Sequence, residues 1–407
     1  MERLISLTGL FTMLALAWLF SNNRRRMNWR LILSGVGLQL TFGIFMLGTS
    51  PGKVLFDFSR TVIGGLIQCS DAGAKFVFGS FFFEKPFDSP PFAYTVLPTV
   101  IFFASLTAVL FHLGVLQWVV KAMARVMAWV MDTSGSESLC TAANVFVGMN
   151  VAPLSIKPYL STMTRSELMA MMTGGMATVA GGVMAAYAAM GADAGHLMVA
   201  SVMSAPAALV VAKIMVPETE PSLTKGVVKI DVPKTDSNVL DAACRGAGEG
   251  LKLALNIAAM IIAFIALVHL CNWILGACPL VDGQPLSLER ILGWVFAPLA
   301  WVMGIEWKDA QTVGTLLGEK TVFNEFIAYQ HLAGEMKHTL SPRSVTIATY
   351  ALCGFANFGS IAVMIGGISG LVPERRRDFA KLGLKSMIGG TLAAFMTASI
   401  AGMLIGG

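Results

Sequence analysis

Apolar stretches of about 20 residues alternate along most of this chain with short polar or charged segments. A stretch of that length is enough for a helix to cross the hydrocarbon core of a bilayer. The pattern therefore predicts an all-α polytopic membrane protein with about eight transmembrane helices. We place these helices near residues 4–21, 31–49, 93–112, 167–189, 195–215, 251–275, 345–371 and 383–405.

Two segments, residues 134–162 and 314–340, are too polar to be simple membrane spans. Polar groups at membrane depth are tolerated only inside protein or beside a watery cavity, because each charge facing lipid costs at least about 2.5–3.5 kcal/mol. We therefore expect two re-entrant hairpins around a buried polar site. The polar residues within them are Asn144 and Asn150 in the first, and Glu319, Lys320, Asn324 and Glu325 in the second.

The two halves of the chain repeat each other in outline. Amphipathic stretches at residues 116–131 and 286–302 precede the two hairpins and are expected to be helices in the membrane interface. After the hairpins, residues 175–181 (GMATVAG) align without a gap with residues 354–360 (GFANFGS). Each half therefore consists of a hairpin, a basic turn and a glycine-broken span, which indicates an internal repeat.

Basic residues predict how the chain is oriented in the membrane. Four arginines among residues 24–30 place the first loop in the cytoplasm and the N-terminus outside. If the hairpins do not cross, residues 157–165, 217–241 and 375–381 are also cytoplasmic, and the C-terminus is outside. The two repeats then begin on opposite sides of the membrane. Inverted repeats with interrupted helices are typical of secondary transporters, whose binding sites lie near the bilayer midplane.

We divide the chain into four parts on this basis. These are N-terminal scaffold helices with the first interfacial helix, a first transport repeat, a linker with a scaffold span and the second interfacial helix, and a second transport repeat. The boundaries are residues 1–133, 134–216, 217–305 and 306–407. The short chain without long tails suggests a multi-pass protein of a bacterial inner membrane.

The composition of the chain mainly argues against other classes of protein. The chain is 55% hydrophobic and 13% charged, and its mean hydropathy is +0.70, so water is not its main solvent. The net charge of +5 could suggest nucleic acid, but no soluble stretch is long enough to form a basic groove, so no nucleic-acid partner is expected. The six cysteines lack CxxC spacing, which argues against a zinc site or a disulfide framework.

Motifs typical of enzymes are also missing from the sequence. The five histidines are dispersed without an HExxH motif, and neither a GxSxG elbow nor a GxxxxGK[ST] loop is present. We therefore expect neither an enzyme nor a cofactor, and no direct use of ATP. A passive channel would need a continuous polar stripe rather than one polar cluster near the midplane.

Three motifs resemble the concentrative nucleoside transporter family, and the resemblance extends over nearly the whole chain. GEKTVFNEF at residues 318–326 is similar to the family's second-hairpin signature, and GFANFGS at 354–360 to the span that follows it. APLSIKPY at residues 152–159 resembles the end of its first hairpin. The resemblance implies a homotrimer in the lipid bilayer. Each protomer would take up nucleosides with a sodium or proton gradient, moving a transport domain against a scaffold.

The resemblance also implies a ribose site. Glu325 and Asn357 would bind the ribose hydroxyls, Ser360 would assist, and Phe355 would pack against the sugar and base. A carboxylate and an amide supply the acceptors and donors that a vicinal diol needs, and hydrogen bonds to a charged group are the stronger kind. The simpler alternative is that Glu325 forms a structural ion pair with Lys320.

A sodium site is implied in the same way. Asn144 and Thr178 would contribute side-chain oxygens, and Val147 and Val179 would contribute backbone carbonyls. Oxygen ligands suit a hard cation. The alternative is that Asn144 caps a broken helix and Thr178 bonds its own backbone. Sodium is preferred over the proton as the coupling ion, and both remain open.

The first hairpin departs from the family pattern. Many members carry Gly-Gln-Thr-Glu before Ala-Pro-Leu, where those side chains contact the nucleobase, but this chain has Gly148, Met149, Asn150 and Val151. Asn150 is then the only obvious polar contact for the base, beside apolar Val183. We expect an altered nucleobase preference, with purines, a C-linked base such as that of pseudouridine, or another ribose-like ligand accepted. The lost acid also leaves proton coupling as an alternative.

Overall fold

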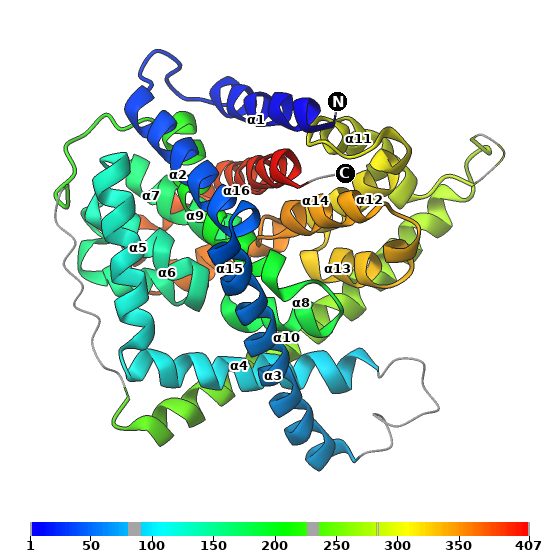
Figure 1. The fold of residues 1–407 in the computed structure, drawn as a ribbon, viewed down its shortest axis with the longest axis horizontal. Helices are drawn as coiled ribbons and strands as arrows, with labels where there is room; N and C mark the ends of the chain where they lie inside the picture. Colours follow the sequence, from blue (N-terminus) through cyan, green and yellow to red (C-terminus); the bar gives the residue numbers. More distant parts are fainter. Residues whose placement is uncertain (1, 80–90, 226–235, 282, 284, 406–407) are drawn as a thin grey trace.

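The structure is a computed structural model that describes residues 2–79, 91–225, 236–281, 283 and 285–405 (Figure 1). The described residues form sixteen α-helices and short 3₁₀ helices, and an isolated β-bridge joins Ser134 and Lys225. The predicted all-helical fold class is confirmed. Residues 226–235, within the segment expected to be a cytoplasmic linker, lie outside the described residues.

The first half of the chain contains the N-terminal helices and the first repeat. Its helices are α1 (Glu2–Leu19), α2 (Trp29–Gly48), α3 (Ser50–Phe78), α4 (Phe92–His112), α5 (Val115–Met131), α6 (Gly135–Val147), η2 (Ala152–Tyr159), α7 (Arg165–Ala177), α8 (Gly181–Ala189) and α9 (Ala194–Met215). The second half contains α10 (Val239–Leu275), α11 (Leu288–Val302), α12 (Trp307–Val322), α13 (Glu325–Ala333), η3 (Glu335–His338), α14 (Pro342–Leu352), α15 (Phe358–Ser369), η4 (Pro373–Arg375) and α16 (Arg376–Leu404).

Among the described residues, seven helical segments are long and apolar enough to cross a membrane. They are α1, α2, α4, α7 with α8, α9, α10, and η4 with α16, and they match seven of the predicted spans. The expected eighth span at 345–371 is not continuous, because α14 and α15 are separated by a break at residues 353–357. Sequence analysis missed α3, whose 29 residues include five charged side chains that hide its helical pattern.

Both predicted hairpins are present as pairs of short helices. In the first, α6 is followed by a turn and then by η2, where Pro153 and Pro158 accompany a 3₁₀ rather than an α-helical arm. The second consists of α12 and α13 and begins at Trp307, earlier than the expected residue 314. The expected amphipathic helices are α5 and α11, and α11 meets α12 at a bend of 119°. The same order of elements therefore occurs in both halves.

Burial is concentrated in the helices around the hairpins. In the most apolar 18-residue window of each span, 89% of α9 and 78% of α16 is buried, against 17% of α10. Figure 1 shows α16 in the middle of the molecule, while α4 and α10 pack together along its edge. On α10 the side chains of Leu255, Ile262 and Trp273 are 60%, 72% and 78% exposed, as expected for contact with lipid.

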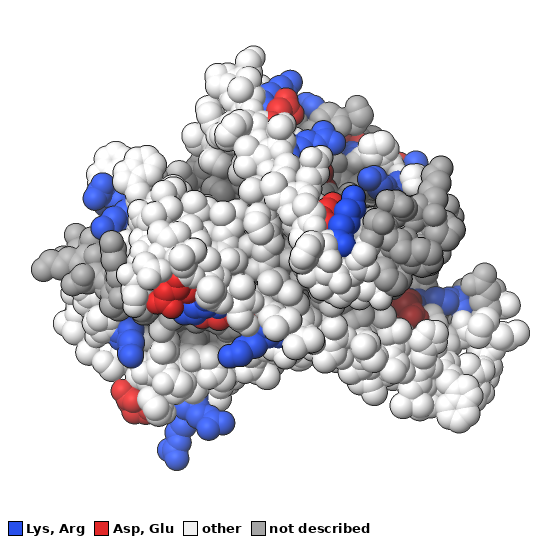
Figure 2. Space-filling view, turned by 90° about the horizontal axis from the view of Figure 1, so that it is seen from below, with Lys and Arg blue, Asp and Glu red and all other residues white. Residues whose placement is uncertain are grey.

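Charged side chains on the visible surface are sparse. Figure 2 shows a face that is mostly uncharged, on which Lys, Arg, Asp and Glu gather in small separate patches. A broad uncharged surface suits hydrocarbon, whereas the charged patches suit the two aqueous boundaries.

The two broken spans meet at a glycine. Gly354, in the break after α14, has φ +126°, a conformation that residues with a side chain rarely adopt. A Cβ at this position would lie 2.8 Å from the carbonyl oxygen of Met176 and 2.9 Å from that of Ala177. The backbone of the second repeat therefore lies directly on the last turn of α7. This close approach brings the interrupted segments of both halves together.

Candidate functional site

The side chain of Glu325 lies at the tip of the second hairpin, at the first position of α13. Asn324 precedes it as the N-cap, and its side-chain oxygen accepts a hydrogen bond from the Ile327 amide at 3.1 Å. The N-terminus of a helix carries a partial positive charge, which favours a carboxylate there. Glu325 is only 2% exposed, so its carboxylate depends on protein partners for stabilisation.

Two donors from different helices hold this carboxylate. The Tyr187 hydroxyl on α8 donates to Oε1 of Glu325 at 2.8 Å, and the Asn357 amide donates to Oε2 at 2.9 Å. Asn357 is also the N-cap of α15, where its Oδ1 accepts from the Ser360 backbone amide at 2.8 Å. The predicted residues Glu325, Asn357 and Ser360 are therefore brought together, and Phe355 lies half-buried in the adjoining break.

Aromatic rings support this group from one side. Tyr187 stacks on Tyr329 with ring centroids 4.3 Å apart, and Phe326 meets Tyr187 edge-on at 4.9 Å. The Tyr329 hydroxyl donates to the carbonyl oxygen of Thr349 at 2.7 Å. Sequence reasoning missed Tyr187. The available signal was a tyrosine within an apolar run, because a buried phenol needs a hydrogen-bond partner.

The alternative ion pair between Glu325 and Lys320 does not occur in the structure, which describes both residues. Lys320 is fully buried, and its ammonium group donates to the carbonyl oxygen of Ala351 at 2.8 Å. That carbonyl belongs to the last turn of α14, where a positive charge is favourable. Glu325 therefore takes its direct contacts from Tyr187 and Asn357 and not from a basic residue.

The implied sodium ligands lie where α6 and α7 end. Two contacts show that the two helices run side by side in the same direction. A Cβ on Gly174 would lie 3.0 Å from the Thr141 hydroxyl oxygen. Further along, a Cβ on Gly148 would lie 2.8 Å from that of Ala180. Asn144 falls between these two contacts and therefore lies beside the last turn of α7. The carbonyl ends of two helices meet there, which favours a cation.

The oxygen atoms of the four implied sodium ligands differ in the hydrogen bonds that they already make. Oδ1 of Asn144 is buried and has no hydrogen-bond partner. The Thr178 hydroxyl donates to the carbonyl oxygen of Gly174 at 2.8 Å, as the alternative interpretation expected, but its lone pairs remain available. The Val179 carbonyl accepts from Ser201 at 3.2 Å. Val147, the last residue of α6, is half-buried. The group fits a cation through Asn144 most directly.

The residues expected to contact the base lie in the turn of the first hairpin. A Cβ on Gly175 would lie 2.8 Å from Cβ of Met149 and 3.0 Å from the terminal methyl of Met364, so Met149 covers α7 close to α15. A Cβ on Gly367 would lie 3.1 Å from Oδ1 of Asn150. Met364 is about 10 Å along α15 from Asn357, at 1.5 Å per residue. The turn therefore faces α15 well beyond Asn357.

Two further residues complete the group expected at the base. Val151 is half-buried, and its amide donates to the Gly148 carbonyl at 3.2 Å, which closes the turn. Val183 is 3% exposed on α8, one helical turn before Tyr187. Neither bonds to Glu325 or Asn357. The turn residues and the ribose residues thus lie at different heights along α15, while Val183 lies one turn from Tyr187 on α8.

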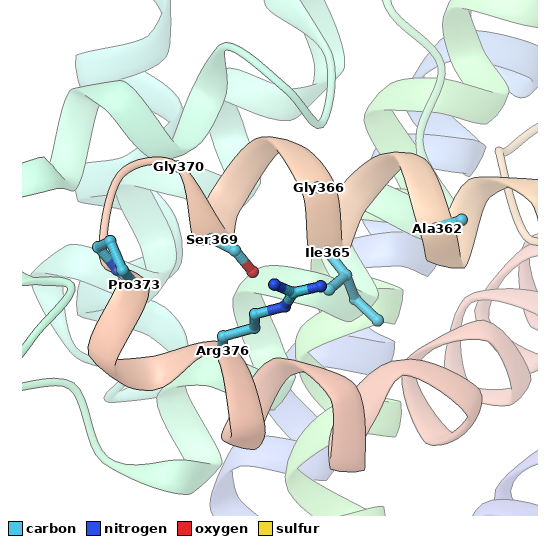
Figure 3. A pocket seen from close by; sticks show the side chains of 7 residues that line it. All are labelled: Ala362, Ile365, Gly366, Ser369, Gly370, Pro373 and Arg376. Atoms are coloured by element: carbon cyan, nitrogen blue, oxygen red, sulfur yellow. The ribbon is translucent and has the colours of Figure 1, made fainter.

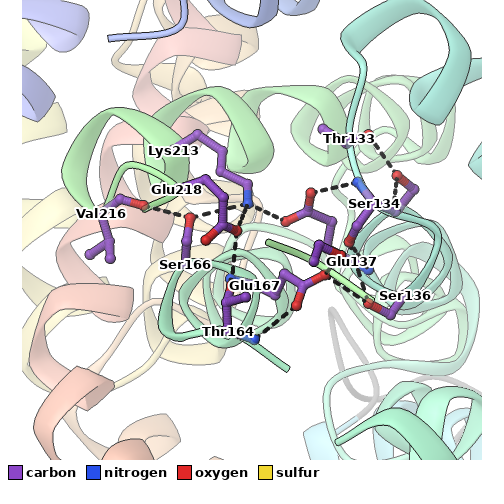
Figure 4. Close-up of polar contacts among 12 residues, drawn as sticks. Thr133, Ser134, Ser136, Glu137, Thr164, Ser166, Glu167, Lys213, Val216 and Glu218 are labelled. Atoms are coloured by element: carbon purple, nitrogen blue, oxygen red, sulfur yellow. Dashed lines mark hydrogen bonds and ion pairs between the residues drawn. The ribbon is translucent and has the colours of Figure 1, made fainter. Parts of the chain in front are cut away.

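A cluster of buried polar side chains fixes the start of α6 beside the start of α7 (Figure 4). Each helix begins with a capping box, Ser134 with Glu137 on α6 and Thr164 with Glu167 on α7. In a capping box the two side chains bond each other's backbone amides. Both pairs show the S/T-x-x-E spacing in the sequence, which was a usable signal that sequence analysis overlooked.

Lys213 joins this cluster from the end of α9. Its ammonium group lies 2.7 Å from a carboxylate oxygen of Glu137, 3.2 Å from one of Glu218 and 3.1 Å from the Ser166 hydroxyl. Lys213 and Glu137 are 8% and 2% exposed, so their charges compensate each other away from water. The cluster sets the relative position of α6 and α7 at one end, and the implied sodium ligands lie at the other.

Comparisons with known proteins match this chain over nearly all its length. The family model described as Na+ dependent nucleoside transporter C-terminus matches residues 196–402, and the corresponding N-terminus model matches residues 8–81. A third model, described as Gate, nucleoside recognition, matches residues 93–194. The implied ribose and sodium residues all fall within these three matches.

Individual relatives are similar over most of the chain. Solute carrier family 28 member 3 of Rattus norvegicus is 44% identical over 99% of this chain, which spans 59% of that relative's length. The uncharacterized transporter YutK of Bacillus subtilis is 42% identical over the full length of both. A structure of CNTnw in an inward-facing substrate-bound state has a TM-score of 0.92 and 40% identity, covering 99% of this chain and 98% of that one.

We expect Lys213→Met to destabilise the protein strongly, by about 3–5 kcal/mol, because it leaves the buried Glu137 carboxylate without a counter-charge. Thermal unfolding in detergent measures the effect. Lys225→Met is the matched control, since its ion pair with Asp132 is largely exposed and contributes at most about 1 kcal/mol. Adding Glu137→Gln to Lys213→Met should restore part of the loss. Equal stability of the two single variants would contradict this role.

Proposed function

The chain belongs to the Na+-dependent nucleoside transporter family, and from this premise we propose that it takes up nucleosides by symport with sodium. The family is one of transporters and not of enzymes. The observation that carries the proposal is the buried Glu325 carboxylate, held by Tyr187 and Asn357 where the two broken spans meet. Tyr187 belongs to a helical segment long and apolar enough to span the membrane, so we infer that a ligand bound at Glu325 lies within the transport path.

The ribose is proposed to bind at Glu325 and Asn357. Two carboxylate oxygens offer about four lone-pair sites, and the protein occupies one on each oxygen, which leaves two for the hydroxyls of a vicinal diol. One amide hydrogen of Asn357 is also free to donate. The Ser360 hydroxyl, 7% exposed, makes no hydrogen bond to another described residue and can assist. Phe355 supplies an apolar surface for the sugar and base.

Sodium is proposed as the coupling ion at the joined ends of α6 and α7. The buried, unpartnered Oδ1 of Asn144 supports this assignment, with Thr178 and the carbonyls of Val147 and Val179 as further ligands. One elementary charge crossing the membrane supplies about 2.3 kcal/mol per 100 mV, and each tenfold accumulation requires roughly 1.4 kcal/mol. One cation can therefore drive useful uptake.

A proton-coupled carrier for a modified nucleoside such as pseudouridine, or for another ribose-like ligand, is the second candidate. Its support is that the Val179 carbonyl already accepts a hydrogen bond from Ser201, which leaves one fewer free oxygen for a metal ion. The apolar turn of Met149 and Val151 also fits a base that needs few polar contacts.

We further propose a homotrimer in a bacterial inner membrane, with both termini outside. The exposed apolar face of α10 supplies surface for neighbouring protomers as well as for lipid. Native mass spectrometry of the purified protein should give three times the 43.3 kDa mass of one chain, and a monomer alone would count against the trimer.

Glu325→Gln should reduce sodium-driven uptake of radiolabelled uridine into proteoliposomes by about tenfold or more. The variant replaces hydrogen bonds to a charged acceptor, worth about 1.5–3 kcal/mol each, by weaker ones. Glu220→Gln, at an exposed position, is the control and should transport normally. With the unmodified protein, 2′,3′-dideoxyuridine should compete poorly. Competition equal to that of uridine would contradict the ribose site.

A sodium gradient alone should drive accumulation of uridine, and Asn144→Ala should raise the half-saturating sodium concentration at least about tenfold through loss of a buried ligand. Asn23→Ala, in an exposed loop, is the control. Uptake is measured against sodium concentration with no proton gradient. Accumulation with a proton gradient and no response to sodium would instead establish the proton-coupled alternative.

Uptake rates of uridine, adenosine, inosine and pseudouridine should fall within about tenfold of one another. A site with few buried polar partners rejects related ligands poorly, whereas an unpaired polar group penalises the wrong ligand heavily. Parallel uptake assays of the four nucleosides measure this preference. Strict selectivity for uridine would show that the apolar turn of the first hairpin does not broaden recognition.

A further inference from the structure

A cavity lies at the opposite end of α15 from Asn357. It has a volume of about 510 Å³ and opens between the last turns of α15 and the start of α16 (Figure 3). Its lining consists of small residues on α15 together with the corner that leads into α16. The lining residues are Ala362, Ile365, Gly366, Ser369, Gly370, Pro373 and Arg376.

Two hydrogen-bond donors in this cavity have no acceptor. The Ser369 hydroxyl oxygen is buried and has no partner, although helical hydroxyls such as that of Ser399 donate to a carbonyl one turn earlier. The Arg376 guanidinium extends into the cavity beside Ser369, and it makes no hydrogen bond or ion pair with another described residue. Neighbouring Arg375, by contrast, bonds Asp378 and the Ser161 carbonyl.

The ligand that would satisfy both groups must carry acceptor oxygens and negative charge. A hydroxyl and a guanidinium are both donors here, and a guanidinium forms its stronger hydrogen bonds with anionic oxygens. Buried polar groups in proteins almost always find a partner, and the Ser369 hydroxyl lacks one, whereas the Arg376 side chain is exposed. The exposed side chains of Arg377 and Lys381 lie within five residues of Arg376 and add positive charge. Two acidic residues are also near: Asp378 pairs with Arg375, and Glu374 is exposed.

The cavity is also polar at one end only. From Ala362 to Gly370 its wall follows α15 for about 12 Å, at 1.5 Å per residue. A Cβ on Gly366 would meet no atom within 4 Å, so this wall leaves open space. The apolar end points toward the interior site at Asn357, and the two donors lie where α15 ends. The donors therefore lie near the membrane surface and the apolar part lies deeper.

We propose that this cavity binds the phosphate group of an anionic lipid, with the start of an acyl chain along Ala362 and Gly366. Basic pockets at the ends of membrane helices on the cytoplasmic side suit such head groups, and the arginine-rich corner is predicted to be cytoplasmic. A free phosphate ion offers the same chemistry to Ser369 and Arg376 but makes no use of the apolar wall. Lipid binding would hold the far end of the helix whose first turn carries Asn357 and Ser360.

Thermal unfolding of the purified full-length protein in phosphate-free detergent tests this proposal. Phosphatidylglycerol, phosphatidylcholine or inorganic phosphate is added at matched concentrations to the unmodified protein, to Arg376→Gln, to Ser369→Ala and to the control Arg377→Gln. Phosphatidylglycerol should raise the unfolding temperature of the unmodified protein and of Arg377→Gln, because a ligand of the folded state stabilises it. Arg376→Gln should weaken the apparent affinity by about tenfold or more, and Ser369→Ala by less.

Comparing phosphatidylglycerol with inorganic phosphate distinguishes a lipid head group from a free phosphate ion as the ligand. An equal response to inorganic phosphate, lost in Arg376→Gln, would support the anion site but assign it to a soluble phosphate. The same response to phosphatidylglycerol in Arg376→Gln as in Arg377→Gln would overturn the proposal, as would no response of the unmodified protein to either anion. Arg376 and Ser369 touch no residue of the ribose or sodium groups, so normal uridine uptake by both variants leaves this test independent of the transport proposal.

Discussion

A carboxylate buried within a membrane protein must be stabilised by other groups of the protein, and at Glu325 this requirement governs the surrounding structure. Leaving such a charge unpaired in an apolar interior would cost several kcal/mol. The chain supplies a helix N-terminus from α13, a phenol from α8 and an amide from α15. Asn357 lies at the break before α15, so the interrupted helix is what allows this donor to reach the carboxylate, whereas Tyr187 comes from the second half of α8.

In both halves of the chain, the carbonyl ends of helices carry a partial negative charge that a positive charge can stabilise. In the first half, α6 and α7 end together, and the unpartnered oxygen of Asn144 lies beside these carbonyl ends. In the second half, the ammonium group of Lys320 occupies the end of α14 by bonding Ala351. A resident positive charge thus lies at the end of α14, while the ends of α6 and α7 carry the oxygen atoms that we propose as ligands of an exchangeable cation.

The position of the proposed cation site depends on contacts far from it. Lys213 and the two capping boxes hold α6 beside α7 at their first turns, and Gly148 and Gly174 hold them close at their last. The first hairpin and the broken span after it are therefore joined at both ends of this helix pair. The cavity at Arg376 lies at the far end of α15, where a bound lipid would hold that helix at the membrane surface.

Much of this arrangement could be predicted from the sequence, because polar residues interrupt apolar runs at Asn144 and Glu325 and so reveal both hairpins. The helix α3 could not be predicted from the sequence. Its charged residues give the segment the composition of a loop, although the structure shows a continuous helix. Tyr187 and Lys213 were also missed. Each is a single polar side chain in an apolar helix, and its partner is distant in sequence: Glu325 for Tyr187 and Glu137 for Lys213.

An experimental structure with uridine and sodium bound tests the central claim most directly. The account predicts both ribose hydroxyls within about 3.2 Å of the Glu325 carboxylate or the Asn357 amide, with the base directed along α15 toward Met149 and Asn150. A nucleoside whose base contacts Glu325 while its sugar lies elsewhere, or one bound away from the ends of the broken helices, would contradict it.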